Sequence, residues 1–132
     1  MGAWGTGAFD NDPACDWTND LSDASDLTFV HNTLSSADEV DDDELDVGLS
    51  AEAVAACEVI ARLQGRAGRR DANTKVVDEW VRAHPVKPSP DLVKLATFVL
   101  DRVVAGSELA MLWARDQAWR ASVQDLRKRV AG

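Results

Sequence analysis

The sequence contains little cysteine and no apolar run long enough to cross a bilayer. Its 132 residues include only Cys15 and Cys57, too few for a framework of several disulfides, so we expect both to be free thiols. No apolar stretch approaches the roughly 20 residues that span a membrane. The first residues also lack the bases and the apolar segment of a secretory signal. We therefore expect a cytoplasmic protein without a membrane segment.

Lysine and arginine are absent from residues 1–61, which hold 15 of the 23 acidic residues. The first base is Arg62, and residues 62–132 hold all 14 bases, so formal charges of −15 and +6 give the net charge of −9. This charge asymmetry has two interpretations. In the first, the acidic half packs against the basic half within one domain; in the second, an acidic surface faces a basic partner. Both can hold together. Because phosphates need cations, we expect no nucleic acid to bind through the acidic half.

The apolar residues recur at steps of three and four, without the sustained alternation of strands. This spacing predicts an all-α fold, a compact bundle of five or six helices whose last two form an antiparallel hairpin with a turn at Gly106. We expect residues 1–132 to be a single helical domain, with a Gly/Trp loop at 1–11 and a solvated, partly helical acidic connection at 35–48. The predicted helices cover about 12–21, 26–34, 50–64, 74–84, 90–105 and 107–130.

Capping residues predict where several of these helices begin. Asp12-Pro13 and Ser89-Pro90 are cap-then-proline pairs, and Ser50 is the expected cap of the third helix, with Glu52 near its positive end. Residues 92–104 are apolar over a wide arc, which predicts a central helix covered on several sides.

Three further residues have specific structural predictions. His84 precedes a proline and should end its helix. Cys57 lies on the apolar side of its helix and should be a core residue. Asp116 falls on the apolar side of the last helix, so we expect it to pair with Arg120 or Arg102.

Motifs that commonly carry chemistry are incomplete. The opening GAWGTG is not a phosphate-binding GxGxxG. Residues 1–6 fit the myristoylation pattern but lack the basic second signal that stable anchoring needs. A calcium loop starting at Asp42 would have Val47 at its glycine position and Ala53 at its glutamate position. Zinc spacings and a set of nucleophile, base and orienting residue are missing, so we predict no catalytic residue and no cofactor.

The opening MGAWGTGAFDNDPACDW instead predicts a structural plug. Trp4 and Phe9 are large apolar side chains in a glycine-rich loop, and they must be buried somewhere. We expect them to cluster with Trp17 and Trp113, which would hold the N-terminus against the last helices.

The same opening resembles a bacterial family known only as domain of unknown function forty-two fifty-nine. Members begin Met-Gly-Ala-Trp-Gly-x-Gly-x-Phe, followed by Asn-Asp, a small residue and Asp-Trp. A later stretch with Ser107-Glu108-Leu109 and Leu112-Trp113 is similar to a C-terminal motif of that family. The resemblance implies a small bacterial domain, and it implies no activity and no catalytic residues. The matching positions of the opening are Met1, Gly2, Ala3, Trp4, Gly5, Gly7, Phe9, Asn11, Asp12, Ala14, Asp16 and Trp17.

A small acidic helical domain without catalytic groups favours a non-enzymatic interaction module. Such a module would mask a basic protein partner, as an immunity protein or an antitoxin-like inhibitor does. One alternative is a cation-dependent binder or small enzyme that uses Asp10, Asp12 and Asp16. Another is a regulatory domain that self-associates through an apolar helix face. The oligomeric state stays open. The candidate acidic face consists of Asp16, Asp20, Asp41, Asp42, Asp43, Glu44 and Asp46.

Overall fold

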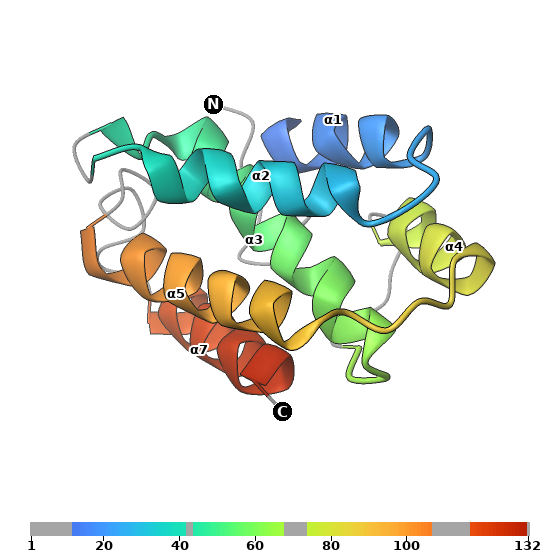
Figure 1. The fold of residues 1–132 in the computed structure, drawn as a ribbon. Helices are drawn as coiled ribbons and strands as arrows, with labels where there is room; N and C mark the ends of the chain where they lie inside the picture. The colour runs from blue at the N-terminus through green and yellow to red at the C-terminus, as the bar shows by residue number, and fades with distance from the viewer. Residues whose placement is uncertain (1–11, 42–43, 68–73, 107–116, 132) are drawn as a thin grey trace.

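The structure, a computed structural model, describes residues 12–41, 44–67, 74–106 and 117–131. This part of the chain is helical and contains no strand, as the apolar spacing predicted. Figure 1 shows α1 and α2 above α3, with α5 and α7 below it and α4 beside its far end. The helices are α1 (Asp12–Leu21), α2 (Thr28–Glu39), α3 (Val47–Leu63), α4 (Lys75–Ala83), α5 (Pro90–Gly106) and α7 (Gln117–Ala131).

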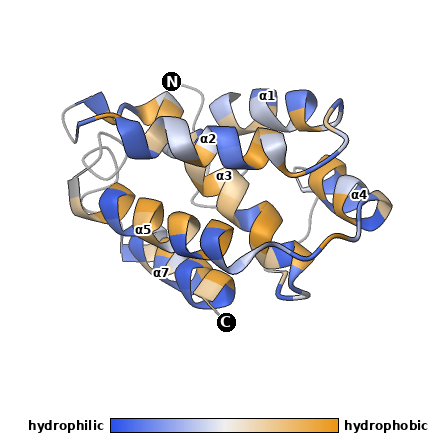
Figure 2. Ribbon diagram, viewed as in Figure 1, coloured by the Kyte–Doolittle hydropathy of each residue, from blue (hydrophilic) through white to orange (hydrophobic). Residues whose placement is uncertain are grey.

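The central helix is α3, which packs against α1, α2, α4, α5 and α7. Figure 2 shows it as largely hydrophobic, whereas the outer helices alternate between hydrophobic and hydrophilic faces. The prediction that residues 92–104 form the central helix is wrong, because Phe98 on α5 is 56% exposed. The physical difference is side-chain size. Small residues let neighbouring helices approach from every side, and α3 carries five buried alanines, namely Ala51, Ala53, Ala55, Ala56 and Ala61.

Helices α5 and α7, the last two that the structure describes, pack together and run in opposite directions (Figure 1), as the predicted hairpin requires. Arg127 on α7 makes a two-pronged ion pair with Asp101 on α5, with its Nε 2.6 Å and its Nη2 3.1 Å from the two carboxylate oxygens. The turn predicted at Gly106 leads into residues 107–116, which lie outside the described residues. Asp116 is among them, so its predicted ion pair stays a prediction.

Helix α3 begins three residues earlier than predicted, and Ser50 is not its cap. The Asp46 carboxylate accepts a hydrogen bond from the Leu49 N–H at 2.8 Å and caps the helix instead. Ser50 is buried in the first turn, where its hydroxyl has no hydrogen-bond partner in the part of the chain that the structure describes. Glu52 consequently lies in the second turn, beyond the strongest influence of the helix dipole. The predicted cap of α5 is confirmed, since Ser89 Oγ accepts from the Leu92 N–H at 3.2 Å.

The acidic connection is shorter than the predicted 35–48. Helix α2 continues to Glu39 with Ala37 buried, five residues beyond the predicted end at Leu34. Arg102 of α5 ends the helix by donating to the backbone oxygens of Ala37 at 3.1 Å, Asp38 at 2.8 Å and Val40 at 2.5 Å. A guanidinium at a helix C-terminus satisfies carbonyls that would otherwise lack donors.

The connection is also anchored in the core. Leu45 is 1% exposed although acidic residues surround it in sequence, and it belongs to the same core cluster as the central helix. Its burial fixes the approach of the chain to Asp46 and hence the start of α3.

Three helices meet at a buried chain of charges that the sequence pattern did not single out. Glu58 and Arg62 pair within α3, and Arg129 of α7 donates to the two Glu58 oxygens at 2.7 and 3.1 Å. Arg62 Nε also donates to Asp78 of α4 at 2.8 Å, and Arg129 Nε donates to Asp125 at 2.9 Å. Glu58 from the acidic half is thus neutralised by two bases from the basic half. The one feature of the sequence that could have indicated this chain of charges is a Glu–Arg pair, four residues apart, inside an otherwise apolar helix.

Replacing Leu45 tests whether the acidic connection is anchored. Leu45→Ala removes a fully buried side chain and should lower the free energy of unfolding by about 3 kcal/mol. Urea unfolding followed by circular dichroism measures the change. Glu44→Ala, at the exposed neighbouring residue, should change stability by less than about 0.5 kcal/mol. Equal effects from the two variants would contradict the anchoring.

Replacing Glu58 tests the buried charge chain. Glu58→Ala leaves Arg62 and Arg129 without their shared carboxylate and should cost about 3 kcal/mol of unfolding free energy. The matched control is Asp125→Ala, which removes a mostly exposed partner of Arg129 and should cost less than about 1 kcal/mol. A cost for Glu58→Ala no larger than that of the control, in the same urea experiment, would show that the chain contributes little.

Candidate functional site

The predicted acidic face is only partly gathered into one place. Asp16 and Asp20 lie exposed on α1, while Asp41, Glu44 and Asp46 are exposed in the connection between α2 and α3. Asp42 and Asp43 lie outside the described residues. Asp16 and Asp20 share the border of a hollow with Glu52 of α3, which the sequence analysis had considered only as a helix-end residue.

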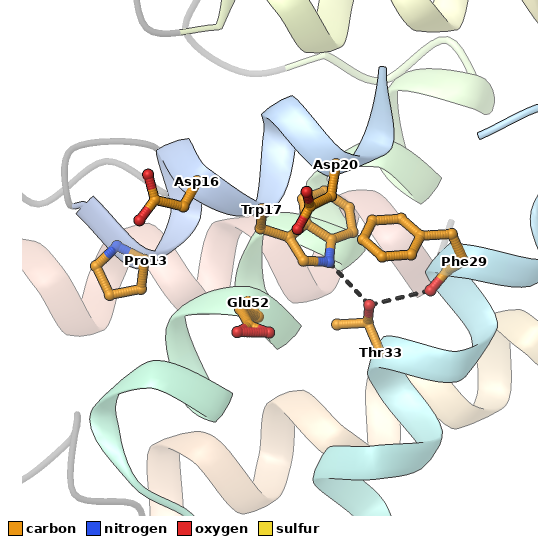
Figure 3. A pocket seen from close by; sticks show the side chains of 7 residues that line it. All are labelled: Pro13, Asp16, Trp17, Asp20, Phe29, Thr33 and Glu52. Carbon is orange, nitrogen blue, oxygen red and sulfur yellow. Dashed lines mark hydrogen bonds between the residues drawn. The ribbon is translucent and has the colours of Figure 1, made fainter. Parts of the chain in front are cut away.

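The hollow has a volume of about 400 Å³ and lies where α1, α2 and α3 meet. Figure 3 shows the carboxylates of Asp16 and Asp20 on α1 and that of Glu52 on α3, with aromatic rings between α1 and α2. Carboxylates therefore border an apolar floor. The hollow is lined by Pro13, Asp16, Trp17, Asp20, Phe29, Thr33 and Glu52.

The floor of the hollow is held in place by Trp17. Its ring stacks on Phe29 with centroids 5.2 Å apart and an angle of 22° between the ring planes. Its indole N–H donates to Thr33 Oγ1 at 2.8 Å, and the Thr33 hydroxyl donates to the Phe29 backbone oxygen at 3.0 Å (Figure 3). Because Trp17 is buried with its polar atom satisfied, the apolar floor is a fixed part of the α1–α2 contact.

No base in the described part of the chain neutralises the carboxylates of this hollow. Among the described residues, neither Asp16, Asp20 nor Glu52 has a basic partner within ion-pair distance. Burial raises the pKa of the Glu52 carboxyl above its ordinary value, and the charges of Asp46 and Asp20 raise it further. The site thus holds negative charge that a bound cation would stabilise.

The arrangement does not suit a metal ion. No group of three His, Cys, Asp or Glu side chains within the described residues is placed to hold one. Asp16, Asp20 and Glu52 instead lie spread around an opening of several hundred Å³. Because a bare metal ion needs several ligands at about 2.0–2.6 Å, we expect a larger cation, such as a guanidinium or an alkylammonium, to suit this hollow better.

The two cysteines and His84, which the sequence also pointed to, lie in structural positions. Cys57 is buried on α3, its Sγ lies 3.7 Å from the Ala96 backbone oxygen, and burial raises the pKa of its thiol. Cys15 is half-buried, and the two cysteines do not form a disulfide. His84 ends α4, as predicted, and stacks on Trp80 with centroids 4.4 Å apart. The prediction that Cys57 is a core residue is therefore confirmed.

Of the four residues of the predicted aromatic plug, only Trp17 lies within the described residues. Trp17 is buried against Phe29 and Thr33. Trp4, Phe9 and Trp113 lie outside the described residues, so their clustering stays a prediction.

One family model matches residues 2–122, and its description is Domain of unknown function (DUF4259). The chain belongs to this family. No curated protein and no solved structure matches the chain. The DUF4259 region includes α1–α5 and the beginning of α7, so the whole acidic hollow lies within it, whereas Arg129 of the buried charge chain lies beyond it. Within the described residues, every helix is too short or too polar to span a bilayer.

The raised pKa of Glu52 has a consequence for stability. The folded chain holds the Glu52 proton more tightly than the unfolded chain, so the ionised carboxylate costs stability above the folded pKa. Glu52→Gln should therefore raise the free energy of unfolding at pH 7, by about 0.3 kcal/mol once solvent screening is included. The advantage should disappear as the pH falls below the ordinary glutamate value of 4.5, where both states are protonated.

Thermal unfolding at low salt and several pH values measures this difference. Glu79→Gln, at an exposed residue of α4, is the matched control and should show no such pH-dependent gain. A loss of stability at pH 7 in Glu52→Gln would contradict the unfavourable charge at this position.

Proposed function

We propose that this DUF4259 protein is a non-enzymatic interaction module that binds a basic protein partner through its acidic hollow. An immunity protein or antitoxin-like inhibitor works in this way, by covering a cationic surface. The proposal places the protein in the cytoplasm. The observation that supports it is the placement around an apolar floor of three carboxylates, those of Asp16, Asp20 and Glu52, which have no basic partner among the residues that the structure describes.

The chemistry of the hollow favours a lysine or arginine side chain of the partner. A guanidinium or ammonium group can reach the carboxylates of Asp16 and Asp20 while its aliphatic stem lies on the apolar lining. Glu52 gains most from such a contact, because its charge is already disfavoured by burial and by its acidic neighbours. Arginine suits the site best, because a planar guanidinium can meet two carboxylates at once.

The charge of the whole chain supports the same kind of partner. A net charge of −9, with every base after position 61, gives the α1–α2 side a negative field. Such a field speeds encounter with a positively charged surface and weakens as salt is added. Affinity for a basic partner should therefore fall at high salt.

The exposed Phe98 on α5 supports one alternative, a self-associating regulatory domain. That function requires a dimer whose population rises with protein concentration. The other alternative, a cation-dependent binder or small enzyme, relies on Asp10, which lies outside the described residues, and on Asp12 and Asp16. It requires calcium or magnesium to raise the melting temperature.

A pull-down from the native host tests the proposal. The bait is the full chain, compared with Asp16→Asn/Asp20→Asn and with the control Asp23→Asn/Glu79→Gln, which removes the same charge from exposed residues outside the hollow. Wild type and control should retain a basic partner at low salt. The hollow variant should bind the purified partner about tenfold more weakly, which corresponds to about 1.4 kcal/mol.

Several outcomes would overturn the proposal. These are equal binding by the hollow variant, a captured partner of acidic surface, or retention that does not change with salt. Both variants should keep the wild-type circular dichroism spectrum, because each exchanged side chain is exposed.

A further inference from the structure

A second hollow lies at the other end of α3 and has the opposite chemistry. Its volume is about 450 Å³, and it is bounded by the C-terminal turn of α3 and by the segment between α4 and α5. Prolines at 85 and 88 hold this segment out of helical structure, and Pro90 begins α5. The lining residues are Leu63, Gln64, Arg66, Pro85, Val86 and Lys87.

The backbone around this hollow is well defined on both sides. Gly65 has a φ of +78° and turns the chain at the end of α3, where the Arg66 N–H donates to the Ala61 oxygen at 2.9 Å. On the other side, the Val86 N–H donates to the His84 oxygen at 2.7 Å, and His84 is stacked on Trp80. The hollow is therefore built from ordered turns.

The side chains of the hollow combine exposed apolar surface with positive charge. Val86 is 43% exposed, and it is one of two large apolar residues exposed in the described part of the chain. Arg66 and Lys87 are exposed and have no carboxylate partner among the described residues. Arg66 donates only to uncharged oxygens, at 3.2 Å to Gln64 Oε1 and at 3.4 Å to the Arg129 backbone.

We infer that this hollow binds an extended acidic segment of a partner protein. One apolar side chain of the segment lies against Val86 and Leu63, and flanking carboxylates reach Arg66 and Lys87. A second copy of this chain fits less well, because two molecules of net charge −9 repel each other. The inference is independent of the acidic hollow and of the function proposed for it.

The distance between the two hollows lets them act separately. Glu52 and Leu63 are 11 positions apart on α3, which is about 17 Å along the helix axis. The Debye length at physiological salt is about 8 Å, so an acidic segment at Arg66 and Lys87 is largely screened from Asp16 and Asp20. Arg66 and Lys87 can therefore attract an acidic segment although the net charge of the chain is negative.

Two synthetic peptides test the inference on the full ¹⁵N-labelled chain. The acidic probe is acetyl-Glu-Asp-Leu-Asp-Glu-amide, and the neutral probe of equal shape is acetyl-Gln-Asn-Leu-Asn-Gln-amide. The acidic peptide should shift the amide resonances of Arg66 and Val86 in a saturable way, with a Kd of about 1 mM or below. The neutral peptide should bind at least about threefold more weakly.

Three variants separate this site from general attraction to positive charge. Arg66→Gln and Lys87→Gln should each weaken the acidic peptide about threefold, as expected for an exposed ion pair. Arg120→Gln is the matched control, since it removes one exposed base from the first turn of α7, and it should leave the Kd unchanged. The inference is overturned by equal binding of the two peptides, by equal loss in Arg120→Gln, or by no saturation at about 5 mM peptide.

Discussion

Helix α3 is enclosed by α1, α2, α4, α5 and α7, and a charge buried on a helix enclosed in this way is costly unless it is paired. Its alanines permit the close approach of five neighbours, and its only buried acid, Glu58, therefore requires partners inside the protein. Arg62 supplies one partner from the same helix, and Arg129 supplies another from α7. Asp78 and Asp125 extend the chain of charges to α4 and to the surface. The position of α7 against α3 thus depends on charge pairing as well as on apolar packing.

The enclosure of α3 also explains how the uneven distribution of charge along the sequence leads both to ion pairs inside the fold and to exposed acids on its surface. Some bases of the second half are used inside the fold, where Arg62 and Arg129 neutralise Glu58 and Arg102 satisfies the carbonyls that end α2. Asp16 and Asp20 of α1 face outward, and Arg62 lies in the last turn of α3, at the opposite end from Glu52. Internal neutralisation and an acidic outer face therefore coexist in one domain.

The two ends of α3 present opposite chemistry. Near its start, Glu52 joins Asp16 and Asp20 around an aromatic floor, where burial and then the charges of Asp46 and Asp20 raise the pKa of Glu52. At its end, the turn at Gly65 brings Arg66 beside the extended segment that carries Val86 and Lys87. The length of the central helix keeps these two surfaces apart.

The sequence by itself determined the features that depend on local chemistry. Helical spacing predicted an all-α bundle, Ser89 before Pro90 predicted the cap of α5, and a residue before proline predicted the end of α4 at His84. Cys57 was recognised as core from its position on an apolar face. The opening motif was sufficient to indicate the family to which the chain belongs.

Only the tertiary structure decided which helix is central, where the acidic connection begins and which carboxylates come together. Packing depends on side-chain size across neighbours far apart in the chain, so alanine-rich α3 is more enclosed than leucine- and valine-rich α5. Arg102 satisfies the carbonyls at the end of α2 through hydrogen bonds to residues more than 50 positions away in the sequence. Leu45 anchors the start of α3 because it is buried in the shared core. Glu52 joins Asp16 and Asp20 because α1 packs on α3, which no local pattern encodes.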